Sequence, residues 1–202
     1  KSYMDIGEAT IEESQTEDKD WINNWKEYFH QFYVDDILIV PSWEEVKAED
    51  QDKMILHIDT GTAFGTGMHE TTQLVIRQLK KYVTPDTEML DVGTGSGILG
   101  IVAIKLGAKH VLGTDLDPCA VPAVAENKEA NGIPEEAFDM MIGNIIDDKD
   151  VQDQAGYEKY DIVTANIMAD VLIPLTPVIV HQMKKGASYI TSGILAVKEQ
   201  EV

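Results

Sequence analysis

The chain of 202 residues has a single cysteine, Cys119, and few basic side chains, with 16 lysines and arginines against 36 aspartates and glutamates. One cysteine excludes an internal disulfide framework and a metal site built on several thiolates. Because nucleic-acid binding depends on cationic contacts with phosphate, a formal charge of -20 argues against direct nucleic-acid binding. An acidic surface attracts a basic protein instead, although acidic side chains also serve solubility alone.

Long apolar runs are also missing. No stretch approaches the roughly 20 apolar residues that a membrane-spanning helix requires. The N-terminal sequence KSYMDIGEATIEES lacks the basic region and apolar core of a secretory signal. We therefore expect a cytoplasmic protein without membrane association. With 44% hydrophobic residues, the chain is long enough for one well-buried domain.

The first residues differ in character from the rest of the chain. Residues 1–20 are acidic and offer little to bury, and the chain begins without an initiator methionine. We interpret 1–20 as a connector from a preceding domain and 21–202 as the folded domain. Within the latter, the pattern predicts a helix at 21–30, short strands at 36–40 and 53–59, and a helix at 72–82.

From Thr87 onward, apolar strand-like and helix-like segments alternate. They lie at residues 87–92, 98–106, 109–114, 118–131, 137–142, 158–165, 169–183 and 186–192. This alternation predicts a doubly wound α/β fold with a mostly parallel sheet and right-handed crossovers. Asp117 and Pro118 suit the start of the helix at 118–131, and Asn131 with Gly132 suits its end.

The most informative motif is DVGTGSG at 91–97, which ends an apolar run and precedes a helix. Gly93, Gly95 and Gly97 allow a sharp turn and the close approach of a ligand. The loop directs the amide groups of the following helix toward that ligand. Asp115 ends the next strand, where its carboxylate can accept both hydroxyls of a ribose. The two features together predict a nucleotide cofactor.

The identity of the nucleotide depends on Asp91. Gly95, Gly97 and Gly100 also satisfy GxGxxG, with Asp115 twenty residues after Gly95, so a nicotinamide-dependent oxidoreductase stays an alternative. However, the pattern DxGxGxG is typical of Rossmann-like methyltransferases. A carboxylate at Asp91 repels a diphosphate but helps to hold the ammonium group of S-adenosylmethionine, directly or through water. The motif therefore favours S-adenosylmethionine.

Two asparagines extend the predicted site. In a doubly wound sheet, ligands lie beyond the carboxyl ends of the strands, near the point where the strand order reverses. Asn144 follows the third strand and can border the adenine, although asparagine after glycine is also a common turn residue. Asn166 ends the fourth strand, next to the expected position of the reactive methyl group.

Three further motifs resemble those of one family, in the same order. AFGTGMHETT at 63–72 is similar to AFGTGxHxTT, NIMADVL at 166–172 is similar to NIxAxxL, and SGIL stands at 192–195. This is the PrmA family of methyltransferases, which modify large-subunit ribosomal protein eleven, and the resemblance covers about residues 21–202. It implies an S-adenosylmethionine-dependent N-methyltransferase acting on lysine or N-terminal amino groups of a basic ribosomal protein.

The resemblance also implies roles for single residues. Thr72, with Phe64 and Gly65 nearby, is implied as a cofactor contact, and Asn166 as the catalytic residue at the methyl-transfer centre. For His69 in the same loop, a catalytic role and a place at the start of a helix are equally open. We expect no metal site. The expected cofactor-binding residues are Thr72, Asp91, Gly93, Gly95, Gly97, Asp115, Asn144 and Asn166.

The chain departs from the family pattern in three places. The family carries a separate N-terminal substrate-recognition domain, of which we expect only the connector at 1–20. After the fifth strand the fold usually adds a helix and two strands, so we expect the last strands to be lacking and a sheet edge to be exposed. Thr60 stands where proline is usual. A methyltransferase for nucleic acid or a small molecule, and a binding protein without catalysis, stay as alternatives.

Overall fold

The computed structural model describes residues 29–59, 65–198 and 201. Our expectations for the connector at 1–20, for most of the helix at 21–30, and for Thr60 and Phe64 lie outside these residues. The described part of the chain contains a three-stranded sheet and a five-stranded sheet. Within it, no helix has the length and apolar character needed to cross a bilayer.

The small sheet consists of β1 (Phe32–Val34), β2 (Ile37–Pro41) and β3 (Met54–Ile58) in that order. β1 pairs antiparallel with β2, and β2 pairs parallel with β3. All of β2 is buried, as its apolar run ILIVP requires. The sequence predicted β2 and β3, but neither β1 nor the fact that these strands form a sheet of their own.

The large sheet is entirely parallel and has the order β6-β5-β4-β7-β8. Its strands are β4 (Glu88–Val92), β5 (His110–Asp115), β6 (Phe138–Ile142), β7 (Tyr160–Asn166) and β8 (Met183–Ser192). The α-helices are α2 (Glu70–Tyr82), α3 (Ile98–Lys105), α4 (Ala120–Ala130), α5 (Lys149–Ala155) and α6 (Ala169–Ile179). Short 3-10 helices are η2 (Ala48–Asp50), η3 (Glu135–Ala137) and η4 (Ala196–Lys198).

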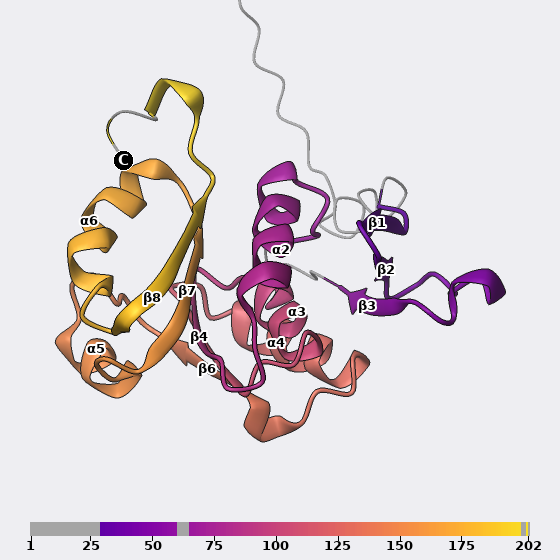
Figure 1. Cartoon of the computed structure of the whole chain (residues 1–202), viewed down its shortest axis with the longest axis horizontal. Coiled ribbons are helices and arrows are strands. Elements are labelled where there is room, and N and C mark those ends of the chain that lie inside the picture. The colour runs from indigo at the N-terminus through magenta and orange to yellow at the C-terminus, as the bar shows by residue number, and fades with distance from the viewer. Residues whose placement is uncertain (1–28, 60–64, 199–200, 202) are drawn as a thin grey trace, which may run out of the picture.

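Different helices cover the two faces of the large sheet (Figure 1). On one face, Met89 of β4 packs in the same cluster as Val75 of α2 and Ile101 of α3. On the other face, its neighbour Leu90 packs in the same cluster as Leu172 of α6. The small sheet packs against α2, α3 and α4. This arrangement confirms the predicted doubly wound α/β class.

The strand order reverses at β4. The chain leaves β4 for β5 and then β6 on one side, and returns to β7 and β8 on the other side. The carboxyl ends of β4 and β7 are therefore neighbours whose exit loops diverge, and Val92 stands opposite Ala165 in their register. Such a reversal creates the crevice in which doubly wound proteins bind ligands.

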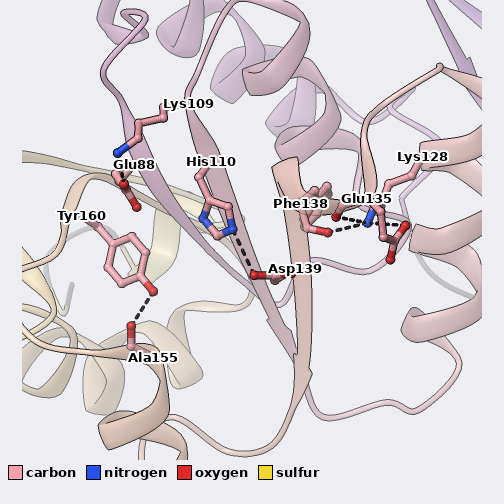
Figure 2. A network of polar contacts seen from close by, with 9 residues as sticks. All are labelled: Glu88, Lys109, His110, Lys128, Glu135, Phe138, Asp139, Ala155 and Tyr160. Carbon is pink, nitrogen blue, oxygen red and sulfur yellow. Dashed lines mark hydrogen bonds and ion pairs between the residues drawn. The ribbon is translucent and has the colours of Figure 1, made fainter.

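The opposite, amino-terminal edge of the sheet is held by ordinary polar contacts (Figure 2). Nζ of Lys109 lies 2.9 Å from Oε1 of Glu88 at the start of β4. Nε2 of His110 lies 3.1 Å from Oδ2 of Asp139, which joins the starts of β5 and β6. These four polar residues therefore bond one another at the edge of the sheet opposite to the carboxyl ends of the strands.

Lys128 of α4 is a buried cation with a structural role (Figure 2). Its Nζ donates to the carbonyl oxygens of Glu135, at 3.0 Å, and Phe138, at 2.6 Å. The Glu135 carboxylate lies 3.1 Å from the same nitrogen. Because the ammonium group is surrounded by acceptors, its burial is compensated and the turn into β6 is fixed.

The structure differs from the sequence prediction at α4, α5 and α6. α5 was not predicted, because in DKDVQDQAG only Val151 and Ala155 are buried and no long apolar face is visible. The helix predicted at 169–183 ends at 179, since the carbonyl of Gln182 already accepts from the backbone N–H groups of Lys159 and Tyr160. α4 begins at Ala120, two residues later than predicted.

Candidate functional site

The loop after β4 turns in the way that its glycines predict. Gly93, Gly95 and Gly97 have φ angles of 72°, 56° and 80°, in the left-handed region that side chains disfavour. The backbone N–H groups of Gly93 and Thr94 both donate to the carbonyl of Thr114, at 2.8 and 3.1 Å. These hydrogen bonds therefore hold the turn at the end of β5.

Asp115 is bound directly to this loop. Its Oδ2 accepts a hydrogen bond of 2.9 Å from the backbone N–H of Gly95, and its Oδ1 accepts one of 3.0 Å from Asp117. A carboxylate has about four acceptor positions, so two stay available for further donors. The structure thus brings together the two features that predicted a nucleotide cofactor.

Asp91 lies behind the loop, with only 1% of its surface exposed. Its Oδ2 accepts from the hydroxyl of Thr94 at 2.7 Å, and its Oδ1 accepts from the hydroxyl of Thr164 at 2.6 Å. Burial raises the pKa of Asp91 to about 6, and the charge of Asp115 acts in the same direction. The carboxyl group therefore joins β4, the glycine loop and β7 in the interior.

Asn166 and Thr72 form the second contact between predicted site residues. Nδ2 of Asn166 donates to Oγ1 of Thr72 at 3.0 Å. Thr72 is buried in the first turn of α2, and Asn166 is the last residue of β7. The hydrogen bond therefore fixes the start of α2 at the edge where the strand order reverses.

His69 is the N-cap residue of α2. Its Nδ1 accepts from the backbone N–H of Thr71 at 3.3 Å and lies 2.7 Å from the hydroxyl of the same residue. An acceptor at this position satisfies one of the free N–H groups at the start of a helix. The structure therefore shows the helix-start role that the sequence left open.

Asn144 makes a local turn after β6. Its Oδ1 accepts from the backbone N–H of Ile146 at 3.0 Å, and its Nδ2 donates to Asp147 at 3.0 Å. This is the geometry by which asparagine commonly stabilises a turn. Both the oxygen and the nitrogen of the Asn144 side-chain amide therefore have partners within the turn. Its contact with the adenine stays a prediction.

The motifs that carry the family resemblance meet at this same edge. Gly193 of SGIL has a φ of 85°, and a Cβ there would lie 2.4 Å from the carbonyl oxygen of Ile167 in NIMADVL. A Cβ on Gly93 would lie 2.6 Å from Cγ2 of Ile167. Ser96 donates from its hydroxyl to the carbonyl of Gly65 at 2.7 Å. The exit loops of β4, β7 and β8 therefore pack closely against one another.

Comparison with known proteins assigns the family. Residues 1–202 match the family model described as Ribosomal protein L11 methyltransferase (PrmA). The chain belongs to the PrmA family. The resemblance predicted for about residues 21–202 is thus confirmed, and the match extends it to residues 1–20.

Curated relatives in this family are similar over the full length of the chain. The Ribosomal protein L11 methyltransferase of Lachnospira eligens is 58% identical over 202 residues, which cover 100% of this chain and 64% of the relative. That of Agathobacter rectalis is 55% identical over 205 residues, again covering 100% of this chain and 64% of the relative. The chain therefore spans 64% of the length of these curated relatives.

A solved member of the PrmA family confirms the fold. The crystal structure of ribosomal protein L11 methylase from Lactobacillus delbrueckii subsp. bulgaricus superimposes with a TM-score of 0.74 and 34% identity. The match covers 86% of this chain and 84% of that chain. The Rossmann-like methyltransferase architecture expected from the sequence is therefore the observed one.

Sequence reasoning missed several polar residues that support the site of this PrmA family member. Thr164 and Thr94 hold Asp91, and Asn127 of α4 donates to the carbonyl of Ser96 at 2.9 Å. The available signal was a polar residue at a buried position. Thr164 interrupts the apolar strand YDIVTAN, and Asn127 shares the buried face of α4 with alanine and valine residues.

Proposed function

We propose that this chain is the S-adenosylmethionine-dependent methyltransferase part of an enzyme that methylates amino groups of ribosomal protein L11. The acceptor groups are lysine side chains, an N-terminal amine, or both. In this proposal residues 21–202 form the methyltransferase domain, and 1–20 are the connector from a substrate-recognition domain. Support comes from the relatives' name and from one observation, the hydrogen bonds that join Asp115 to the glycine loop and Asn166 to Thr72 at the carboxyl ends of neighbouring strands.

The described residues fit this cofactor. The left-handed turns at Gly93, Gly95 and Gly97 shape the loop against which the methionine part would lie. A Cβ on Gly97 would meet Val124 at 3.0 Å, so this glycine serves the packing of the loop on α4. Asp115 has acceptor positions left for two ribose hydroxyls. The remaining contacts that we propose are Thr72 near the methionine end and Asn144 near the adenine.

Asp91 contributes to binding from the interior. Its carboxylate is closed off from solvent and bound by two hydroxyls, so it acts on a ligand's ammonium group chiefly through its electric field. In the low dielectric of the interior, such a charge acts over a longer range than it does in water. The same charge disfavours a diphosphate, which supports S-adenosylmethionine over a nicotinamide dinucleotide.

S-adenosylmethionine supplies an electrophilic methyl group on a sulfonium when it is bound. The protein must then hold a neutral amine in line with that methyl, and alignment of this kind contributes about 7–11 kcal/mol in well-oriented systems. Asn166 suits this task, because its Nδ2 is engaged by Thr72 and its Oδ1 can accept a hydrogen bond from the amine. A lysine with a reference pKa of about 10.4 loses its proton through desolvation or to water before the attack.

The charge of the chain supports a basic protein as the substrate. A formal charge of -20 attracts a cationic ribosomal protein and disfavours the phosphate backbone of nucleic acid. A ribosomal substrate also implies that the reaction takes place in the cytoplasm.

The proposal is tested by methyl transfer. The intact protein is incubated with S-adenosylmethionine carrying a labelled methyl group and with purified L11, and mass spectrometry locates the label. We expect label on L11 amino groups, and an Asn166→Ala variant that transfers it at least tenfold more slowly. A parallel reaction contains ribosomal RNA in place of L11, and label on the RNA but not on L11 would overturn the proposed substrate.

A further inference from the structure

Helix α4 presents two asparagines, one helical turn apart, to the chain at β3. Oδ1 of Asn131 accepts from the backbone N–H of His57 at 2.9 Å, and its Nδ2 donates to the carbonyl of His57 at 2.6 Å. Asn127 makes the same pair with Asp59, at 2.8 and 2.7 Å. Each side-chain amide therefore bonds both backbone groups of one residue, as a neighbouring strand does.

Asn127 makes one further contact that its neighbour does not. Its Nδ2 also donates to the carbonyl of Ser96 in the glycine loop at 2.9 Å. The corresponding second hydrogen bond of Asn131 goes to the backbone carbonyl of Asn127 in its own helix, at 2.7 Å. Of the two asparagines, Asn127 is therefore the one that connects the residue after β3 with the loop.

Ser96 extends this connection to a third segment. It is fully buried, and its hydroxyl donates to the carbonyl of Gly65 at 2.7 Å. Asp59, the glycine loop and Gly65 are thus joined through Ser96 and Asn127. Gly65 opens the described segment that leads to Thr72 and hence to the contact with Asn166.

Asn127 and the loop carbonyl that it bonds both lie in the interior of the protein. Asn127 is 1% exposed and Ser96 is fully buried, so the carbonyl of Ser96 stays buried when it loses this partner. Because the peptide unit is planar, holding the carbonyl of Ser96 also fixes the N–H of Gly97, which begins α3. Asn127 therefore determines the orientation of the loop at the start of the helix.

We propose that Asn127 is a positioning residue for the cofactor. It holds the glycine loop against Asp59 and, through Ser96, against Gly65, and so sets the shape of the crevice without contacting the ligand. This inference rests on the proposed function, because it concerns binding of S-adenosylmethionine.

Asn131 provides a matched control. In the intact protein, Asn127→Ala and Asn131→Ala each remove a two-bond pair with β3 or the residue after it, and we expect both to lower the melting temperature, Asn127→Ala more because Asn127 is more deeply buried. Only Asn127→Ala releases Ser96. We expect it to raise the Kd for S-adenosylhomocysteine and the KM for S-adenosylmethionine about tenfold, with kcat within about twofold, whereas Asn131→Ala leaves both constants within about twofold.

Three results would overturn the inference. The first is Asn127→Ala binding S-adenosylhomocysteine as tightly as wild type, and the second is equal weakening in both variants, which would show a purely structural effect. The third is wild type that binds no S-adenosylhomocysteine, which removes the proposed function itself. Asn127→Asp supplies the test if Asn127→Ala does not fold, because the carboxylate keeps an acceptor for the backbone N–H of Asp59 and loses the donor to the carbonyl of Ser96. We expect it to raise the same KM, and an unchanged KM would contradict the inference.

Discussion

Nδ2 of Asn166 donates a 3.0 Å hydrogen bond to Oγ1 of Thr72, which joins the end of β7 to the first turn of α2. The two residues lie 94 positions apart in the chain. The bond occupies the donor end of the amide and leaves its oxygen to accept from a substrate amine. The hydrogen bond therefore links the start of α2 to the proposed methyl-transfer centre. A substitution at Thr72 should change the orientation of the Asn166 side chain.

The pair gives a first prediction. Thr72→Val removes the hydroxyl with little change in volume, and Thr72→Ser keeps it. Loss of a buried hydrogen bond costs about 1–1.5 kcal/mol, so we expect Thr72→Val to lower kcat about tenfold, with a smaller change in the KM for S-adenosylmethionine. Steady-state kinetics with L11 as the acceptor measures both. Equal kcat values for the Val and Ser variants would contradict a positioning role for the hydroxyl.

Asp115 gives a second prediction. Asp115→Ala removes the proposed ribose acceptor and the partner of the Gly95 N–H, so we expect S-adenosylhomocysteine to bind 10-fold to 100-fold more weakly, corresponding to about 1.5–3 kcal/mol. Asp117→Ala is the control, since Asp117 lies two residues away and its carboxylate bonds the backbone N–H of Cys119. Calorimetric titration gives both affinities. If the two variants lose the same affinity, Asp115 has no specific part in binding.

The buried carboxyl of Asp91 gives a third prediction, on pH. Burial raises its pKa from 3.8 to about 6 in the folded protein, so between these pH values the folded chain keeps a proton that the unfolded chain has lost. Stability from this group therefore falls as pH rises from about 4 to 6. The change corresponds to roughly 3 kcal/mol.

Asp91→Asn tests this, because asparagine does not titrate. We expect the free energy of unfolding of the variant to rise relative to wild type between pH 4 and pH 6, and the difference to stay constant above pH 7. Carboxylates with lowered pKa values, such as Asp35 and Asp161, act in the opposite direction but are present in both proteins. Urea denaturation at each pH measures the difference, and a difference that does not change with pH would show that Asp91 is not perturbed.

Two glycines at the same φ give a fourth prediction. Gly186 and Gly193 both have φ near 85°, but a Cβ on Gly186 would meet nothing within 4 Å, whereas one on Gly193 would lie 2.4 Å from the carbonyl oxygen of Ile167. Gly186→Ala should therefore cost only the left-handed strain of about 1–2 kcal/mol. Gly193→Ala must also move Ile167, which is next to Asn166.

We accordingly expect Gly193→Ala to lose more thermal stability than Gly186→Ala and to lower kcat, while Gly186→Ala leaves kcat unchanged. Melting curves and methyl-transfer rates of the two variants check this. Matching losses in both variants would mean that the close approach to Ile167 has no bearing on the site.

The parts of the fold that the sequence predicted are those with strong local signals. The central strands of the large sheet contain short buried apolar runs, such as Met89–Leu90 in β4 and Val111–Leu112 in β5, and the glycine loop combines three residues that readily take left-handed turns. Helix α5 has no such signal, because it is seven residues long and starts from the local cap of Asp148. The short strand β1 depends on pairing with β2, which no local pattern shows.

In the candidate site, too, the features with a local sequence signal were predicted and the contacts that depend on tertiary packing were not. Asp115 and the glycine loop lie close in the sequence and were predicted from spacing, and the structure joins them by a hydrogen bond. Asn127 and Ser96 are 31 residues apart, and their contact depends on how α4 packs against the loop. A buried asparagine on the apolar face of a helix indicates that a partner exists, but not which backbone group it is.

The most direct test of the proposed cofactor is calorimetric titration of the intact protein with S-adenosylhomocysteine and, separately, with NAD. The buried carboxylate of Asp91 and the free acceptor positions of Asp115 lead us to expect micromolar binding of S-adenosylhomocysteine and no binding of NAD. Binding of NAD without binding of S-adenosylhomocysteine would contradict the assignment and point to an oxidoreductase.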